Sequence, residues 1–407
     1  MIPHARVRRG AKRAAAGSVS ERAPTVACGA ARSPIRRTDV SEPSFQDLRA
    51  DDFVLESLPD EVLASMERRD RELVDLPFID VGLESLVADV QAWRPGQRIR
   101  VAFLGGNTEL HESIESATRE ITEIANIILD FRDDDGSFRT WSITDTGYGA
   151  EIRISFDQGG YFSLVGTDSI DPRIGLPHHP VGGAPHQRTL NLGGFHLARP
   201  NGWEGTVRHE FLHALSFHHE HQNMRGPCEA AFRWDDDPDY RPTRDARGAY
   251  VVDPEGRRPG IYTYLSGYPN GWPRSKVDHN LRTATDGRSL MAGPFDPASV
   301  MLYRFPALFY RSNPSPCAPA GDGQHLSDGD KRALRLLYPA AQPHVEAIEL
   351  RRERLADLLD PVESDADEGL ESGLQRGSTF ARELASRLRQ ERDAISHPDA
   401  RPGNRAT

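Results

Sequence analysis

The stretch His209-Glu210-Phe211-Leu212-His213-Ala214-Leu215-Ser216-Phe217-His218-His219 decides how this chain folds and what chemistry it can carry. Residues four apart lie one above the other on a helix, so His209 and His213 can both point toward one metal ion at about 2.0 to 2.1 Å. Glu210 then lies beside that ion, where a carboxylate can take a proton from a metal-bound water whose pKa has fallen to roughly 7. The spacing predicts a helix that carries a zinc site suited to hydrolysis.

A third ligand cannot come from the same unbroken helix. His219 lies six positions past His213 and would point about 240° around the helix axis, away from the ion. Glu220 returns to the correct face, but roughly 10 Å further along the axis. If the site forms, we therefore expect the helix to end shortly after His213 and the chain to fold back, so that His219 reaches the metal.

The extended pattern resembles that of the metzincin zinc proteases, HExxHxxGxxH, in which glycine ends the helix because it accepts positive φ. The resemblance assigns His209, His213 and His219 to one zinc ion per chain, and Glu210 to the role of catalytic base. Ser216 stands at the glycine position, and a serine in the left-handed region costs on the order of 1 kcal/mol more than glycine. We expect Ser216 to adopt positive φ, and a glycine there to relieve backbone strain.

A second motif lies about eighty residues downstream, in the stretch Asp296-Pro297-Ala298-Ser299-Val300-Met301-Leu302-Tyr303. Its Ser-x-Met-x-Tyr core resembles the Met-turn of the astacin branch of the metzincins. By that resemblance, Met301 forms an apolar floor under the zinc histidines, and Tyr303 is a fifth ligand or an oxyanion donor. Taken alone, a methionine two positions before a tyrosine is an ordinary pattern of strands and cores.

Further stretches extend the likeness to bacterial astacin-like proteases from about residue 93 to residue 339. The resemblance implies an α+β fold of the metzincin type, with a twisted mixed five-stranded sheet and two long helices above the active-site cleft. An irregular lower subdomain would follow and end in a helix. A substrate peptide would add as a strand along one edge of the sheet. The residues expected to bind it are Tyr161, Phe162, Ser163, Leu164 and Val165.

The chain divides into four predicted parts. Residues 1–50 lack periodicity and are rich in Arg, Ala, Pro and Ser, which predicts a disordered basic leader. Residues 51–92 contain a short helical pattern and form a pro-segment or a brace. Residues 93–340 form the catalytic domain. Residues 341–407 form a charged helical tail, whose two helices are solvated or loosely docked, with a role in partner binding or export as the alternative.

Composition sets looser limits on partners and location. Because the sequence has no apolar run near 18 residues, no membrane span is expected. The first forty residues carry nine basic side chains against two acids and lack the apolar centre of a secretory signal peptide, which predicts a cytoplasmic chain or one exported by a non-classical route. The formal net charge of −11 argues against nucleic acid as a partner. The oligomeric state is left open.

Three cysteines, Cys28, Cys228 and Cys317, allow at most one disulfide bridge. Cys228 and Cys317 lie in the same half of the predicted catalytic domain, and their pairing is left open. Cys28 precedes a glycine, and its thiolate could in principle cap the zinc ion.

The motifs together predict a zinc metalloendopeptidase that hydrolyses peptide bonds through a zinc-activated water, with a protein or peptide as substrate. Two other classes stay open. One is a zinc-binding protein that is impaired in catalysis, motivated by Ser216 at the helix break and Leu302 in the Met-turn. The other is a non-peptidase zinc hydrolase that uses the same three histidines.

Overall fold

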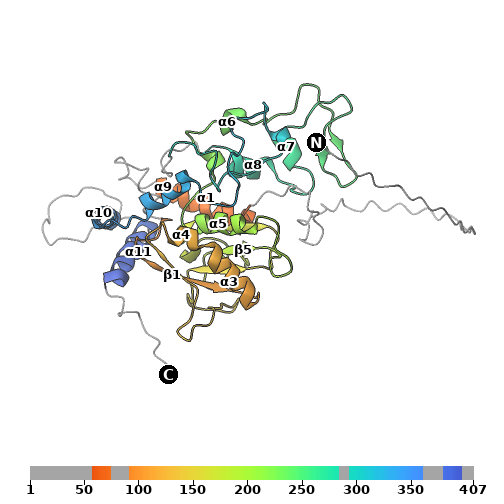
Figure 1. The fold of residues 1–407 in the computed structure, drawn as a ribbon. Helices are drawn as coiled ribbons and strands as arrows, with labels where there is room; N and C mark the ends of the chain where they lie inside the picture. Colours follow the sequence, from red (N-terminus) through yellow and green to blue (C-terminus); the bar gives the residue numbers. More distant parts are fainter. Residues whose placement is uncertain (1–56, 75–90, 284–292, 361–378, 397–407) are drawn as a thin grey trace, which may run out of the picture. The chain divides into compact units, whose positions relative to one another are not determined.

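The computed structural model describes residues 57–74, 91–283, 293–360 and 379–396 (Figure 1). The predictions for residues 1–50, including the one for Cys28, lie outside the described residues. Among the described helices, none is long and apolar enough to cross a membrane.

A mixed five-stranded sheet organises the first half of the described chain, as the resemblance implies. Its strand order is β2-β1-β3-β5-β4, and neighbouring strands are parallel except for β4, which runs antiparallel to β5. The central strand β3 is buried at every position, as expected of a strand that is covered on both faces. The strands are β1 (Arg98–Phe103), β2 (Ile128–Asp130), β3 (Ile152–Ser155), β4 (Tyr161–Ser163) and β5 (Leu190–Leu192). Strand β4 therefore lies at an edge of the sheet, as expected for the strand predicted to bind substrate.

Two helices pack together over this sheet, α3 (Thr108–Ala117) and α5 (Trp203–Ala214). Helix α3 begins at Asn107, whose side chain accepts a hydrogen bond from the N–H of Leu110 at 2.9 Å. The short helix α4 (Arg119–Thr122) follows it. Ile114 and Ile121 from these two helices and Phe211 from α5 are fully buried in the main core, together with the inward side chains of the strands. This core fixes the position of α5, which carries the zinc motif.

The second half of the described chain is irregular, as expected, and has its own apolar core around Phe232, Ile261 and Phe309. Cys228 and Cys317, which are 89 residues apart, form a disulfide bridge inside it, which settles the pairing that the sequence left open. The short elements are α6 (Cys228–Ala231), β6 (Thr243–Arg244), β7 (Tyr250–Val251), α7 (Ile261–Leu265), α8 (Arg274–Leu281), η3 (Glu220–Gln222) and η4 (Ala307–Phe309). Helix α9 (Asp328–Leu337) follows near the end of this half.

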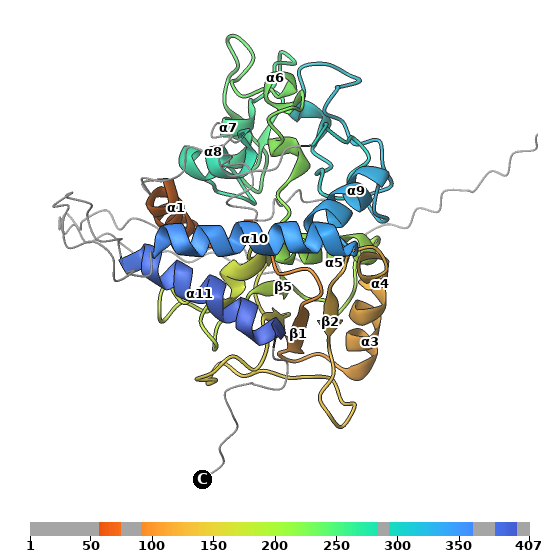
Figure 2. The same cartoon turned by 90° about the vertical axis from the view of Figure 1, so that its left-hand side faces the viewer.

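Two long helices follow, α10 (Gln342–Leu359) and α11 (Thr379–Ser396), and they lie side by side (Figure 2). They share an apolar cluster of their own. Two buried arginines also tie them to the body: Arg94 pairs with Glu349 and donates to the carbonyl of Leu388, and Arg352 donates to the carbonyl of Ala92 at 3.1 Å. The structure thus differs from the expectation of solvated or loosely docked helices, because buried guanidinium groups need these partners.

Helix α1 (Asp60–Val74) confirms the short helical pattern seen in residues 51–92. Its apolar side chains Val62, Leu63 and Met66 are buried in a cluster that also contains Phe162 and Leu164 from the β4 region. The helix therefore packs beside the edge of the sheet.

Candidate active site

Helix α5 ends where the sequence requires it to end. Ser216 has a φ of 71°, in the left-handed region, as expected. Its N–H donates to the carbonyl of His213 at 2.8 Å, and the N–H of Phe217 donates to the carbonyl of Leu212 at 3.0 Å. This pair of bonds is the Schellman arrangement that closes many helices at a left-handed residue. The chain then turns back toward the helix, and His219 follows.

The serine at this turn makes a contact that a glycine would lack. Its hydroxyl donates to the carbonyl of Gln91 at 2.8 Å. Gly166 packs closely against the Ser216 hydroxyl and the Gln91 carbonyl. A Cβ at this position would lie 2.1 Å from the hydroxyl and 2.0 Å from the carbonyl oxygen, so a side chain has no room there. A hydrogen bond of this kind contributes about 1 kcal/mol, which offsets the cost of positive φ at a serine. The hydrogen bond from the hydroxyl explains how this chain can have serine where the metzincin pattern has glycine and still form the same turn at the end of α5.

The three predicted ligands converge. One ring nitrogen from each of His209, His213 and His219 lies within 4.8 Å of the other two. The Nε2 atoms of His213 and His219 are 3.0 Å apart. Two nitrogen ligands of a tetrahedral zinc ion lie about 3.4 Å apart, so a small movement of these rings would accept the ion. The donor set and its spacing fit zinc.

Hydrogen bonds orient two of the rings. Nδ1 of His209 lies 2.9 Å from the carbonyl oxygen of Val300, and Nδ1 of His213 lies 2.7 Å from that of Phe217. A carbonyl only accepts, so each Nδ1 carries the hydrogen and each Nε2 presents a lone pair. Burial, followed by the neighbouring imidazoles, lowers the pKa of His213 and of His219 well below the usual value. Both rings are neutral at physiological pH, which is the form that binds zinc.

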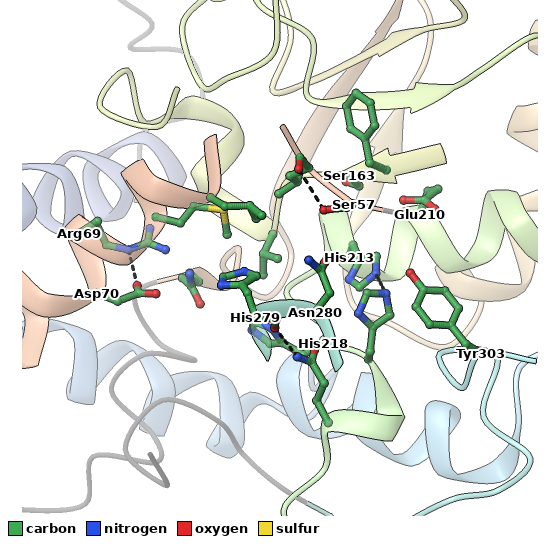
Figure 3. A pocket seen from close by; sticks show the side chains of 18 residues that line it. Ser57, Arg69, Asp70, Ser163, Glu210, His213, His218, His279, Asn280 and Tyr303 are labelled. Atoms are coloured by element: carbon green, nitrogen blue, oxygen red, sulfur yellow. Dashed lines mark hydrogen bonds and ion pairs between the residues drawn. The ribbon is translucent and has the colours of Figure 1, made fainter. Parts of the chain in front are cut away.

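The catalytic side chains predicted from the two motifs lie at one end of a single cavity of about 210 Å³. Figure 3 shows Glu210 and Tyr303 there, beside His213. Glu210 is fully buried. The Tyr303 ring centroid lies 4.4 Å from that of His219 and 5.4 Å from that of His209. The structure therefore brings both motifs to one place, although they are about ninety residues apart.

Asp330, at the start of α9, holds the Met-turn in position. Its carboxylate accepts from the Ser299 hydroxyl at 2.6 Å, from the N–H of Val300 at 3.0 Å and from the N–H of Ser327 at 3.0 Å. Because the carbonyl of Val300 orients His209, Asp330 acts on this predicted zinc ligand through one peptide unit. The sequence patterns predict no role for Asp330 at the site, although the Ser327-x-x-Asp330 spacing is a capping-box signal.

Met301 and Glu220 connect the two motifs. Met301 is buried in the main core, and its carbonyl accepts from the N–H of Glu220 at 3.0 Å. The Glu220 carboxylate accepts from the N–H of Asp296 at 2.8 Å and from the side chain of Asn223 at 2.9 Å. Burial raises the pKa of Glu220 to about 7. The segment after His219 is thus fastened to both ends of the Met-turn.

Three of the five expected substrate residues, Phe162, Ser163 and Val165, line the cavity. The other two lie elsewhere: Leu164 is fully buried, and the Tyr161 ring packs against that of Phe195 at 5.5 Å. The cavity is also lined by side chains that local sequence patterns did not indicate, which come from α1, from α8 and from the segment that follows Ser216. They include Arg69, Asp70, His218, Gln222, His279 and Asn280.

No protein-family model and no curated protein matches the chain. Several solved structures do. A structure of myroilysin is 25% identical and covers 63% of this chain and 98% of its own, with a TM-score of 0.44. A second crystal structure of myroilysin is 25% identical and covers 61% of this chain and 86% of its own, with a TM-score of 0.38. High choriolytic enzyme 1, a hatching enzyme zinc-protease from the medaka fish Oryzias latipes, is 16% identical and covers 62% of this chain and 96% of its own, with a TM-score of 0.34.

The chain resembles the astacin-like metzincins, as its two motifs predict, and it has the α+β fold that this resemblance implies. Its three-histidine cluster, with two rings from the HExxH helix α5 and the third from the chain that follows it, is of the metalloprotease kind.

Proposed function

We propose that the chain is a zinc-dependent metalloendopeptidase. The observation that carries the proposal is the convergence of His209, His213 and His219 beside Glu210 at one end of a cavity. Three imidazoles that leave a fourth position open are the ligand set of a catalytic zinc site, whereas structural sites are closed by four protein ligands. Residues 93–340 would form the catalytic domain and hold one zinc ion.

His209, His213 and His219 would hold the zinc ion, which when bound would supply a Lewis acid that lowers the pKa of a water molecule and polarises a carbonyl group. Glu210 would act as the general base for the attacking water and would later pass the proton to the nitrogen of the leaving amine. The hydroxyl of Tyr303 donates a hydrogen bond to the carbonyl oxygen as negative charge develops there. Met301 keeps the surface under the histidines apolar.

A polypeptide substrate would lie along the edge strand β4. Main-chain hydrogen bonds to an exposed sheet edge give affinity without regard to sequence, and side-chain pockets give preference. Phe162, Ser163 and Val165 face the cavity and would contact the substrate side chains nearest the scissile bond.

The disulfide between Cys228 and Cys317 supports an oxidising place of action. Disulfides persist outside the reducing cytosol, and this bridge is buried inside the core of the lower half. Of the two locations predicted from the sequence, export therefore fits the bridge better than the cytoplasm.

The test compares hydrolysis of casein by the zinc-loaded wild-type chain and by Glu210→Gln, with zinc content measured on both samples. We expect equal zinc and a loss of turnover of about two or more orders of magnitude in the variant, the usual scale for a general base. Zinc without hydrolysis in either sample would favour a zinc-binding protein impaired in catalysis. Hydrolysis of small esters but not of casein would favour a non-peptidase hydrolase.

A further inference from the structure

Helix α1 shares the cavity with the catalytic side chains. Leu63, Met66, Arg69 and Asp70 all line it. In Figure 3, Arg69 and Asp70 lie at the end of the cavity opposite Glu210 and Tyr303. The cavity therefore runs from the predicted zinc ligands to α1, and its far end is lined by the helix.

The helix is held on both sides of this cavity. On the sheet side, Val62 and Met66 pack against Phe162 and other residues of the β4 region. On the side of the lower half, Asp60 pairs with Lys276 of α8 at 2.9 Å, and Glu67 pairs with His279 of α8 at 3.4 Å. Asp60 and Glu67 are both more than half exposed, so water screens these pairs and each contributes little.

The contact between Arg69 and Asp168 is of a different kind. The guanidinium donates to both carboxylate oxygens of Asp168, and the two side chains are only 5% and 1% exposed. Gln91 also donates to Asp168, at 3.5 Å. Such two-pronged pairing is the geometry by which proteins recognise guanidinium and carboxylate groups. Arg69 is the cation that pairs with Asp168 within the described residues.

Asp168 belongs to the body of the protein and not to α1. It lies on the short 3₁₀ helix η2 (Gly166–Ile170), directly after the edge strand. The buried guanidinium of Arg153 on β3 donates to the carbonyl of Ser169 at 2.7 Å and fastens η2 to the sheet. If α1 moves away, Asp168 stays in place as a buried carboxylate that has lost its cation, and such a group strongly favours a new cationic partner.

We propose that Asp168 is the floor of a subsite that selects an arginine side chain of the substrate, and that Arg69 of α1 fills this subsite as an internal occupant. Helix α1 thereby competes with polypeptide for the cleft. The substrate preference rests on the proposed peptidase function, but the binding of a guanidinium group by Asp168 does not. Arginine is favoured over lysine, because a planar fork matches both carboxylate oxygens and a point charge does not.

The first experiment measures binding to the full-length, zinc-loaded chain by calorimetry. The probes are N-acetyl-arginine amide and its neutral isostere, N-acetyl-citrulline amide. In Arg69→Ala, the vacated subsite is expected to bind the arginine probe at least tenfold more tightly than the citrulline probe. The wild-type chain, whose subsite is filled, and the double variant Arg69→Ala/Asp168→Asn are expected to bind neither. Equal binding of the two probes by Arg69→Ala, or arginine binding that survives in the double variant, would overturn the proposal.

A second variant keeps the test valid if Arg69→Ala does not fold. Asp60→Lys/Glu67→Lys places a like charge opposite Lys276 and removes the carboxylate that contacts the His279 ring, and both changes are at exposed positions that leave the subsite intact. We expect this variant to cleave an arginine-bearing peptide several-fold faster than wild type, and in preference to the matched citrulline peptide. Faster cleavage of both peptides alike would mean that α1 only covers the cleft and that Asp168 selects nothing.

The two experiments separate the inference from the proposed function. If the chain is not a peptidase, neither peptide is cleaved, while arginine-selective binding to Arg69→Ala still reports the subsite. If the subsite is wrong, casein is hydrolysed in a Glu210-dependent way, while calorimetry shows no selectivity for arginine.

Discussion

Substitution of Ser216 separates two opposing effects at the turn that brings His219 to the metal site. The first effect is backbone strain, since a serine at a φ of 71° costs on the order of 1 kcal/mol relative to glycine. The second is the hydrogen bond from its hydroxyl to the Gln91 carbonyl, which contributes about 0.5 to 1.5 kcal/mol. Ser216→Gly removes both effects, so we expect its free energy of unfolding to change by less than about 0.5 kcal/mol. The sequence alone predicts that Ser216→Gly stabilises the protein by a fraction of a kcal/mol up to about 1, because no local pattern reveals the hydrogen bond.

Ser216→Ala is the matched control, because it loses the hydroxyl and keeps the strained backbone. We expect it to destabilise the protein by about 1 to 2 kcal/mol, since the buried Gln91 carbonyl loses a donor. The difference between the alanine and glycine variants then measures the strain alone, at about 1 kcal/mol, or roughly 2 to 4 °C in thermal midpoint for a domain of this size.

The assay is thermal unfolding of both variants at saturating zinc. A glycine variant less stable than the alanine variant would refute the reasoning, because it would mean that Ser216 is not in the left-handed region. The helix would then continue past this residue, and His219 could not reach the metal.

Three further predictions concern the metal site and its supports. His219→Ala is expected to lose most of its zinc on dialysis, whereas His218→Ala, at the adjacent half-buried ring, keeps about one zinc per chain; equal retention in both would remove His219 from the ligand set. Asp330→Asn is expected to lower the free energy of unfolding by about 2 to 3 kcal/mol and zinc affinity by roughly tenfold or more, because it weakens the hydrogen bonds that hold the Met-turn. The exposed neighbour Asp328→Asn should change neither quantity in calorimetric melting and zinc titration. Replacing Cys228 and Cys317 together by serine should destabilise the protein by about 2 to 4 kcal/mol in chemical unfolding, and an unchanged midpoint would mean that the bridge contributes nothing.

The sequence predicts the grouping of the three histidines where geometry leaves few choices. The spacing of His209, His213 and His219 allows one metal only if the helix ends shortly after His213, and the helix ends at Ala214, with Ser216 in the left-handed region. The edge position of β4 and the mixed sheet were expected from the astacin-like resemblance, and the sheet has that form.

Features that depend on contacts between distant segments could not be predicted. The pattern of Val62, Leu63 and Met66 indicates a helix, but nothing local indicates that the helix lies against the catalytic cavity. In the sequence, Arg94 and Arg352 resemble ordinary solvated charges. Only the folded chain shows that carboxylates and carbonyl groups surround them.

The zinc K-edge absorption spectrum of the zinc-loaded chain tests the central claim most directly, because it reports the ligands of the bound ion itself. The account predicts about one zinc per chain, three imidazole nitrogens at about 2.0 to 2.1 Å and at least one further light ligand from solvent or Tyr303. Loss of one imidazole in His219→Ala, with no loss in His218→Ala, would accompany this result. A spectrum with only two imidazoles, or one dominated by sulfur or carboxylate ligands, would contradict a catalytic centre formed by His209, His213 and His219.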